Sequence, residues 1–167
     1  MPSVDKPSIY LETSLVSYLV APPSRDLIVA AHQQLTVDWW QGQRGGYDLF
    51  ISQVVVEEVR AGDPQLAARR VAIIDGIAML QISESAIQLA DNLVKSHAVP
   101  QKAAQDALHI AIACANGMSY LLTWNCKHIA NARMRGAIDM VCRQSGYVPP
   151  IICTPEELEE FMSLREG

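Results

Sequence analysis

Short apolar segments alternate with longer helix-forming segments along most of this chain of 167 residues. Strands are expected at 9–11, 47–52, 77–82, 120–123 and 148–153, with helical patterns between them. Two consecutive parallel strands need a long crossover connection, which a helix usually supplies. The alternation therefore predicts an α/β fold, a three-layer α/β/α sandwich around a mainly parallel five-stranded sheet.

Capping residues mark the ends of several expected helices. Thr13 or Ser14 is the expected N-cap of a brief helix directly after the first strand, and Ser24 that of the next helix. Pro100 is expected to open the most apolar helix, over 101–116, and Gly117 to close it. These signals place the helix boundaries between the predicted strands.

The composition indicates one folded domain over residues 1–167. Half of the residues are hydrophobic and 19% are charged, which excludes global disorder. No apolar run approaches the ~18 residues that a membrane span needs, and the N-terminus lacks a signal-peptide pattern. We therefore expect a cytoplasmic protein that does not contact a membrane.

Oxygen-bearing side chains stand at four places where a predicted strand ends or a helix begins. Glu12 follows the first strand, Glu57 and Glu58 follow the second, Asp106 lies in the helix leading to the fourth, and Asn125 follows that strand. Open parallel sheets bind ligands beyond the carboxyl ends of their strands, and Mg²⁺ or Mn²⁺ prefers oxygen ligands. No glycine-rich nucleotide loop follows the first strand. The pattern favours a metal site for phosphodiester chemistry.

Asp106 is the sharpest of these signals because the rest of its helix is nearly apolar. Aspartate is a poor residue inside a helix and is seldom buried without a partner. Lys102 and His109 lie about one turn away on either side, so a local ion pair is the alternative explanation. His109 is a candidate to orient a phosphate or support a ligand, although a single histidine in a helix is more often a hydrogen-bonded core residue.

The four cysteines leave a zinc site as a second metal hypothesis. Cys126 and His128 would combine with Cys142 or Cys153, but this spacing matches no familiar zinc module. The chain contains no Cys-x-x-Cys pair and is large enough to fold without disulfides.

The charge distribution is uneven. The net charge of −5 argues against nucleic-acid binding over the whole surface. Residues 125–147 nevertheless carry four basic side chains against one acid, which gives a local charge of +3: Lys127, Arg133, Arg135 and Arg143 against Asp139. This segment is either a solvated helix face or a strip that holds phosphates.

Four motifs, taken in order, resemble the PIN-domain nucleases, and above all the VapC-like toxin subunits of bacterial type II toxin–antitoxin pairs. They are an Ile-Tyr-Leu-acid-Thr-Ser opening from Ile9, an acid after the Ser-x-x-Val-Val run from Ser52, an Asp-Ala-Leu-His-Ile-Ala helix from Asp106, and a Leu-Leu-Thr-x-Asn strand end from Leu121. The resemblance covers about residues 8–154. Each motif is short, and it is their order and spacing that are specific.

The resemblance implies a small α/β/α sandwich with an acidic pocket that binds Mg²⁺ or Mn²⁺ and cleaves RNA. Carried over by position, the metal ligands are Glu12, Glu58 and Asp106, and Asn125 completes the catalytic set. Glu58 is preferred to Glu57 because of its position relative to the Ser-x-x-Val-Val run, and adjacent helical residues point about 100° apart.

Further site residues and partners follow from the same resemblance and from the local charge. Thr123 and His109 are expected to support the site and Lys127 and Arg133 to bind the RNA backbone, the four forming a weaker substrate-binding set. A toxin of this kind needs a cognate antitoxin protein, and a homodimer is expected.

The sequence departs from the family pattern at two positions. Glu12 and Asn125 stand where the family usually has aspartate, so the pocket offers three carboxylates rather than four. Lower ligand charge weakens cation binding, especially of a second metal. The alternative function is therefore a catalytically weak or inactive PIN-like module that acts through protein or nucleic-acid binding. A small-molecule enzyme with a Rossmann-like sheet is disfavoured because the chain lacks its glycine motif.

Overall fold

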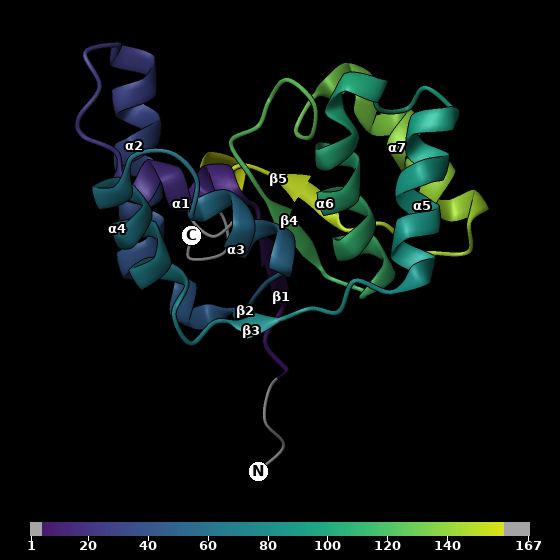
Figure 1. The fold of residues 1–167 in the computed structure, drawn as a ribbon, viewed down its shortest axis with the longest axis horizontal. Coiled ribbons are helices and arrows are strands. Elements are labelled where there is room, and N and C mark those ends of the chain that lie inside the picture. The colour runs from purple at the N-terminus through teal and green to yellow at the C-terminus, as the bar shows by residue number, and fades with distance from the viewer. Residues whose placement is uncertain (1–4, 159–167) are drawn as a thin grey trace, which may run out of the picture.

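A parallel sheet of five strands forms the centre of the computed structural model, which describes residues 5–158. The strand order is β3-β2-β1-β4-β5, and every neighbouring pair is parallel. The strands are β1 (Ser8–Leu11), β2 (Asp48–Ile51), β3 (Ala78–Met79), β4 (Tyr120–Leu122) and β5 (Ile151–Cys153). The predicted α/β class and five-stranded parallel sheet are confirmed (Figure 1).

Helices connect the strands and lie on both sides of the sheet. They are α1 (Thr13–Val20), α2 (Leu27–Gly42), α3 (Gln53–Val59), α4 (Pro64–Ile74), α5 (Glu84–Lys95), α6 (Ala104–Ala115) and α7 (Ala132–Gln144), with short 3₁₀ turns η1 (Arg44–Gly46) and η2 (Gln101–Ala103). Helices α1, α2 and α4 gather on the left of Figure 1, and α5, α6 and α7 on the right. Within residues 5–158, no helix is both long and apolar enough to cross a membrane.

Strand β1 is the middle strand and the most deeply buried. Its residues Ile9, Tyr10 and Leu11 have no exposed surface. Ile9 is in register with residues of both neighbouring strands, Leu49 of β2 and Tyr120 of β4. Because all strands run the same way, the segments that follow β1, β2 and β4 meet at one edge of the sheet. This edge is where the sequence places most of its candidate oxygen ligands.

Two helices begin at acidic residues rather than at the expected hydroxyl residues. Glu12, not Thr13 or Ser14, is the N-cap of α1, and its carboxylate accepts a hydrogen bond from the backbone of Ser14. Asp26, not Ser24, caps α2 by accepting from two amides of the first turn. Both sequence expectations were wrong because the carboxylates, which carry a full negative charge, sit favourably at the positive end of a helix.

The apolar helix expected from Pro100 starts with one tighter turn. Residues Gln101–Ala103 form η2, and α6 proper begins at Ala104. Gly117 closes the helix as predicted, with a φ of +69° that a residue with a side chain rarely adopts. The two outer strands are shorter than expected, β3 with two residues and β5 with three. Pro149 and Pro150, which lack an amide hydrogen, precede β5 and account for its late start.

Candidate functional site at the carboxyl edge of the sheet

Glu12 lies at the carboxyl edge and is held from two neighbouring strands. It directly follows β1, and its backbone amide donates to the carbonyl of Leu122 at the end of β4 over 3.1 Å. Its Oε2 atom accepts hydrogen bonds from the Ser14 amide at 2.9 Å and from the hydroxyls of Thr123, at 2.8 Å, and Ser14. With 5% of its surface exposed, Glu12 is a buried carboxylate with a fixed position.

Glu58 on α3 is linked to the same edge. The Thr13 hydroxyl donates to Glu58 Oε1 over 2.7 Å, and His109 Nε2 lies 2.5 Å from the same oxygen. These two bonds join α3 to the start of α1 and to α6, across 45 and 51 residues of sequence. Glu57 beside it is exposed. The structure therefore brings Glu58, and not Glu57, into contact with the other site elements.

A buried row of polar groups continues behind Glu58. The second ring nitrogen of His109, Nδ1, lies 2.7 Å from the Tyr10 hydroxyl, which lies 2.8 Å from Ser52 Oγ. All three residues have no exposed surface. Sequence reasoning considered His109 but missed Tyr10 and Ser52. The available signals were a tyrosine in an otherwise aliphatic strand and a serine that ends a buried strand.

The pKa shifts in this row follow from burial and from the two carboxylates. Burial raises the pKa of Tyr10 far above its ordinary value, the hydrogen bond with Ser52 opposes this rise, and the charges of Glu12 and Glu58 add to it. Burial also raises the pKa of Glu58, but the hydrogen bonds of His109 and Thr13 outweigh it, so the net shift is downward. Both carboxylates therefore act on the Tyr10 hydroxyl, and Glu58 is held in its charged form.

Asp106 stands in the first turn of α6, three residues before His109, and is half-buried. Among residues 5–158 no side chain forms an ion pair or hydrogen bond with its carboxylate. The local pair with Lys102 or His109 is therefore not formed, because His109 bonds to Glu58 instead. Asp106 is therefore a carboxylate without a partner among the described residues, on the helix that supplies His109.

Asn125 is part of the turn that follows β4. Its Oδ1 atom accepts from the backbone amide of His128 at 3.0 Å, and its own amide donates to Thr123 Oγ1 at 2.9 Å. The amide oxygen expected to serve the site thus already stabilises the turn. The side-chain nitrogen, Nδ2, has no partner among the described residues.

Thr123 and His109, which are expected to support the site, are completely buried. Both reach the site through a carboxylate, Thr123 through Glu12 and His109 through Glu58. Lys127 and Arg133 are exposed, and no ion pair involves them in the part of the chain that the structure describes. These two remain available to an external ligand.

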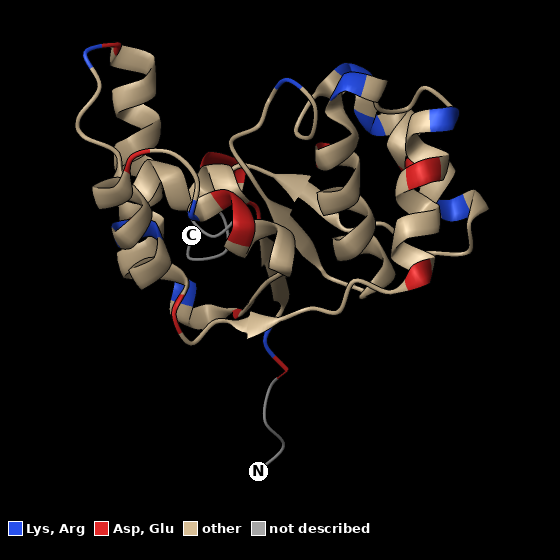
Figure 2. Ribbon diagram, in the orientation of Figure 1, with Lys and Arg blue, Asp and Glu red and all other residues tan. Residues whose placement is uncertain are grey.

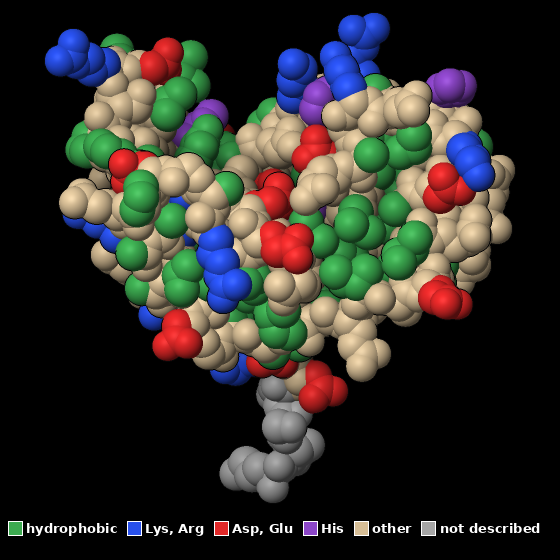
Figure 3. Space-filling model, in the orientation of Figure 1, with side chains coloured by type: hydrophobic (Ala, Val, Ile, Leu, Met, Phe, Trp, Pro, Cys, Tyr) green, Lys and Arg blue, Asp and Glu red, His purple; other side chains and the backbone are tan. Residues whose placement is uncertain are grey.

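The other two basic residues of the predicted strip are engaged in ion pairs. Arg135 lies 3.4 Å from Glu157, and Arg143 lies 2.8 Å from Asp139. Figure 2 shows acidic positions on α3 and one basic position on the loop between β4 and α7. In Figure 3 acidic side chains gather on this face below a hollow in the outline, with lysine and arginine side chains at its right-hand rim.

The donor chemistry of the edge fits a hard divalent cation, but the donors are not gathered into a ready cluster. Over residues 5–158, no three His, Cys, Asp or Glu side chains are arranged so that they could hold a metal ion, and this includes the cysteines of the zinc hypothesis. Each carboxylate nevertheless keeps an oxygen without a partner among these residues. They are Oε1 of Glu12, Oε2 of Glu58 and both oxygens of Asp106.

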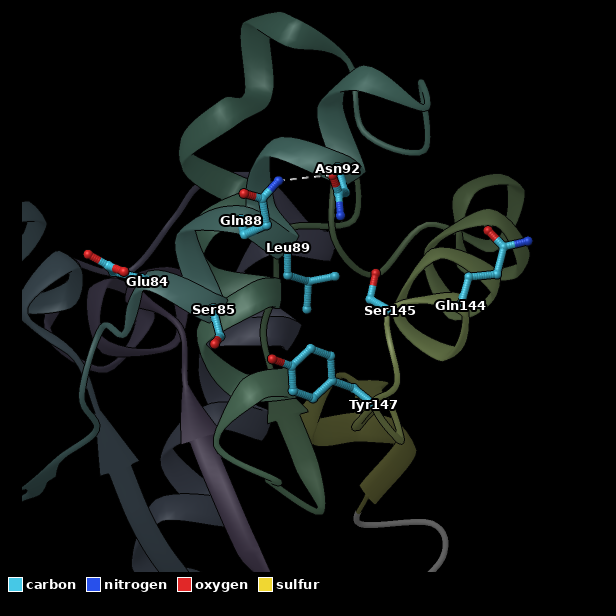
Figure 4. A pocket seen from close by; sticks show the side chains of 8 residues that line it. All are labelled: Glu84, Ser85, Gln88, Leu89, Asn92, Gln144, Ser145 and Tyr147. Atoms are coloured by element: carbon cyan, nitrogen blue, oxygen red, sulfur yellow. Dashed lines mark hydrogen bonds between the residues drawn. The ribbon is translucent and has the colours of Figure 1, made fainter.

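A separate hollow of about 490 Å³ lies between α5 and the end of α7. Figure 4 shows its polar lining, in which Gln88 donates to Asn92 over 3.4 Å opposite Ser145 and Tyr147. Of the residues that line it, only Glu84 is acidic and none is basic. It contains none of the predicted site residues and offers no positively charged group to a phosphate.

Comparisons with known proteins identify the fold. No protein-family model matches the chain, and no curated protein matches it by sequence. Among solved structures, the chain is similar to VapBC2 from Rickettsia felis, bound to a DNA fragment from its promoter, with a TM-score of 0.55 and 13% identity over 87% of this chain and 97% of that one. It is also similar to Mycobacterium tuberculosis VapC20, a sarcin–ricin loop cleaving toxin, with a TM-score of 0.56 and 15% identity over 84% of this chain and 97% of that one. The chain thus has the PIN-like fold of VapC toxins.

Proposed function

We propose that this chain is a metal-dependent endoribonuclease and the toxin component of a type II toxin–antitoxin pair. The observation that carries the proposal is the pair of hydrogen bonds from Thr13 and His109 to Glu58, which joins the segments bearing Glu12, Glu58 and Asp106. The PIN-like fold and the cleavage activity stated for VapC20 support the same reaction class.

Glu12, Glu58 and Asp106 would hold Mg²⁺ or Mn²⁺ through the oxygens that have no partner within residues 5–158. A bound divalent cation activates water and stabilises negative charge on a phosphate. The chain's own part is to fix two of these carboxylates before the ion arrives: Glu12 through Ser14 and Thr123, and Glu58 through Thr13 and His109. A fixed ligand loses less conformational entropy when it binds.

The remaining catalytic and substrate roles fall to the half-buried Asn125 and to two exposed basic residues. Asn125 would donate from Nδ2 to a phosphate oxygen or to a water molecule, because its Oδ1 is engaged in the turn. Lys127 and Arg133 would hold the RNA backbone, since neither is neutralised by a described acid. Positive charge beside an acidic site brings the phosphate to the carboxylates despite the net charge of −5.

A catalytically weak or inactive PIN-like module is the second candidate. The absence of a ready three-ligand cluster within residues 5–158 and the engaged amide oxygen of Asn125 favour it. Such a module would act through protein or nucleic-acid contacts. An antitoxin partner and a homodimer belong to the toxin proposal, and an antitoxin-like reading frame directly upstream of the gene would support it.

The test combines Mn²⁺ titration by calorimetry with cleavage of a structured RNA. Wild type is compared with Asp106→Asn and with the control Asp91→Asn, which alters an exposed aspartate paired with Lys95 on α5. We expect wild type and the control to bind Mn²⁺ and cleave RNA, and Asp106→Asn to lose both. Identical behaviour of wild type and Asp106→Asn, without Mn²⁺ uptake, would favour the inactive module.

A further inference from the structure

Three hydrogen bonds lead from the interior of the protein to Glu58, and a fourth reaches it from Thr13. Ser52, Tyr10 and His109 follow one another at 2.8 and 2.7 Å, and His109 meets Glu58 at 2.5 Å, where Thr13 also donates. The first three residues have no exposed surface, so none of them can touch RNA or an ion in solvent. Among residues 5–158, these three side chains connect to the site through the Oε1 atom of Glu58.

The hydroxyl hydrogens of Ser52 and Tyr10 decide which group donates and which accepts in each bond of this row. Among the described residues, Ser52 Oγ bonds to nothing but Tyr10, so its own hydrogen has an acceptor only if Ser52 donates to Tyr10. Tyr10 then donates its hydrogen to Nδ1 of His109. With Nδ1 as the acceptor, the ring carries its hydrogen on Nε2 and donates it to Glu58.

We propose that His109 is a positioning residue for Glu58, and that Tyr10 and Ser52 act through it by holding its ring in the Nε2–H tautomer. This inference rests on the proposed nuclease function for its catalytic consequence, but not for its structural content. With Oε1 fixed by His109 and Thr13, the carboxylate presents Oε2 in one orientation.

The segments that carry these three residues suggest that the row positions a site residue in addition to packing in the core. Its members come from β1, from the end of β2 and from α6, which are the same segments that precede or carry Glu12, Glu58 and Asp106. A polar row in a core costs stability unless every group is satisfied, and here every hydrogen has an acceptor. An apolar core would need none of these groups.

The test uses Tyr10→Phe, which removes one hydroxyl and keeps the ring, together with His109→Leu. The matched control is Tyr47→Phe, another buried tyrosine, which lies before β2 at the opposite end of the sheet. Nitrogen-15 NMR of the histidine ring, recorded without metal, reports the tautomer. Calorimetry reports Mn²⁺ affinity, and RNA cleavage gives kcat and KM.

We expect wild type and Tyr47→Phe to show the Nε2–H tautomer with Nδ1 accepting a hydrogen bond, and Tyr10→Phe to shift the Nδ1 resonance because that nitrogen loses its donor. Removing a group that orients a metal ligand costs about 10- to 100-fold in affinity or activity, so both site variants should lose Mn²⁺ affinity and kcat by at least tenfold with KM unchanged. A wild-type ring with its hydrogen on Nδ1, or a Tyr10→Phe variant with unchanged Nδ1 resonance, Mn²⁺ affinity and kcat, overturns the inference. If wild type neither binds Mn²⁺ nor cleaves RNA, the nuclease proposal fails, while the NMR result still decides whether the row orients Glu58.

Discussion

Thr13 Oγ1 lies 2.7 Å from Oε1 of Glu58, so the first residue of α1 is bonded directly to α3. Thr13 follows Glu12 in the chain, and this bond therefore fixes the spacing between the two acidic segments. A single hydroxyl thus links the two acidic residues that the sequence places 46 positions apart, from residue 12 to residue 58.

Replacing Thr13 with valine should weaken this link without changing the shape of the side chain. We expect Thr13→Val to lower the free energy of unfolding by about 1 kcal/mol, the typical net value of one hydrogen bond, and to reduce RNA cleavage. Thr13→Ser keeps the hydroxyl and should retain most of both. Urea unfolding and cleavage assays on the two variants decide the matter, and equal effects of valine and serine would contradict the role of the hydroxyl.

The N-cap role of Glu12 predicts a larger loss of stability. Glu12→Ala removes the acceptor of three hydrogen bonds, leaving the Thr123 hydroxyl buried without this partner. We expect a loss of about 2 kcal/mol, since both a helix cap and a buried acceptor disappear. Glu12→Gln keeps an acceptor oxygen and should lose less. Urea unfolding measures both variants, with Glu84→Ala on the exposed start of α5 as the control, and a loss no greater than that of the control would argue against the cap.

The lowered pKa of Glu58 predicts how stability depends on pH in the metal-free protein. Because the pKa is lower in the folded state than its ordinary 4.5, the charged carboxylate stabilises the fold at neutral pH. This contribution is complete above about pH 4.5 and is lost as the pH falls through the folded-state pKa. Glu58→Gln should flatten this part of the profile. Urea unfolding between pH 7 and pH 3 with a chelator measures it, and Glu57→Gln, which alters the exposed neighbour, should follow wild type.

Burial predicts that only one of the four cysteines reacts in the folded protein. Cys126 is exposed, while Cys114, Cys142 and Cys153 are buried, and none forms a disulfide. Burial, with Glu157 adding to it and Arg135 opposing it, raises the pKa of Cys153 to about 12. Iodoacetamide at pH 8 should therefore add one group to the native protein and four in urea, as counted by mass spectrometry. Cys126→Ser should remain unmodified until it unfolds, and modification of that variant in its native state would contradict the burial.

Lys127 and Arg133, which form no ion pair within residues 5–158, should control RNA affinity. Lys127→Ala combined with Arg133→Ala should weaken RNA binding, measured in a chelator so that no cleavage occurs. The slope of log affinity against log salt concentration should fall by about 1 for each phosphate that the variant no longer neutralises. Arg143→Ala is the control, because its guanidinium is bonded to Asp139 and lies only 2.8 Å from it. An equal effect of the control would mean that general charge, and not this pair, attracts the RNA.

The sequence predicted the fold well because its signals are local. Alternation of strands and helices indicates a parallel sheet without any knowledge of long-range contacts. Gly117 was predicted correctly, since a positive φ at a helix end strongly favours glycine and this preference is local. The caps at Ser24 and Thr13 were wrong because a carboxylate one or two residues away competed for the same amides.

The contacts within the site were harder to predict from the sequence, because its hydrogen bonds join segments that are far apart in the chain. The sequence offered Lys102 and His109 as partners for Asp106 at one helical turn, but His109 bonds to Glu58, 51 residues away. The row from Ser52 through Tyr10 could not be predicted from spacing, because its order depends on which strands are neighbours. Short-range periodicity identifies helix faces, whereas such contacts require the tertiary structure.

Strand β1 is made first during synthesis but pairs on one side with β4, whose residue Tyr120 lies opposite Ile9. The hydrogen bond from the Glu12 amide to Leu122 likewise forms only after residues more than a hundred positions later have been synthesised. A nascent chain that has not yet reached β4 therefore lacks half of the support for its central strand, and contacts at such sequence separation form slowly. The acidic edge is assembled only after β4 has been synthesised, so a ribosome that stalls before β4 releases a fragment without it.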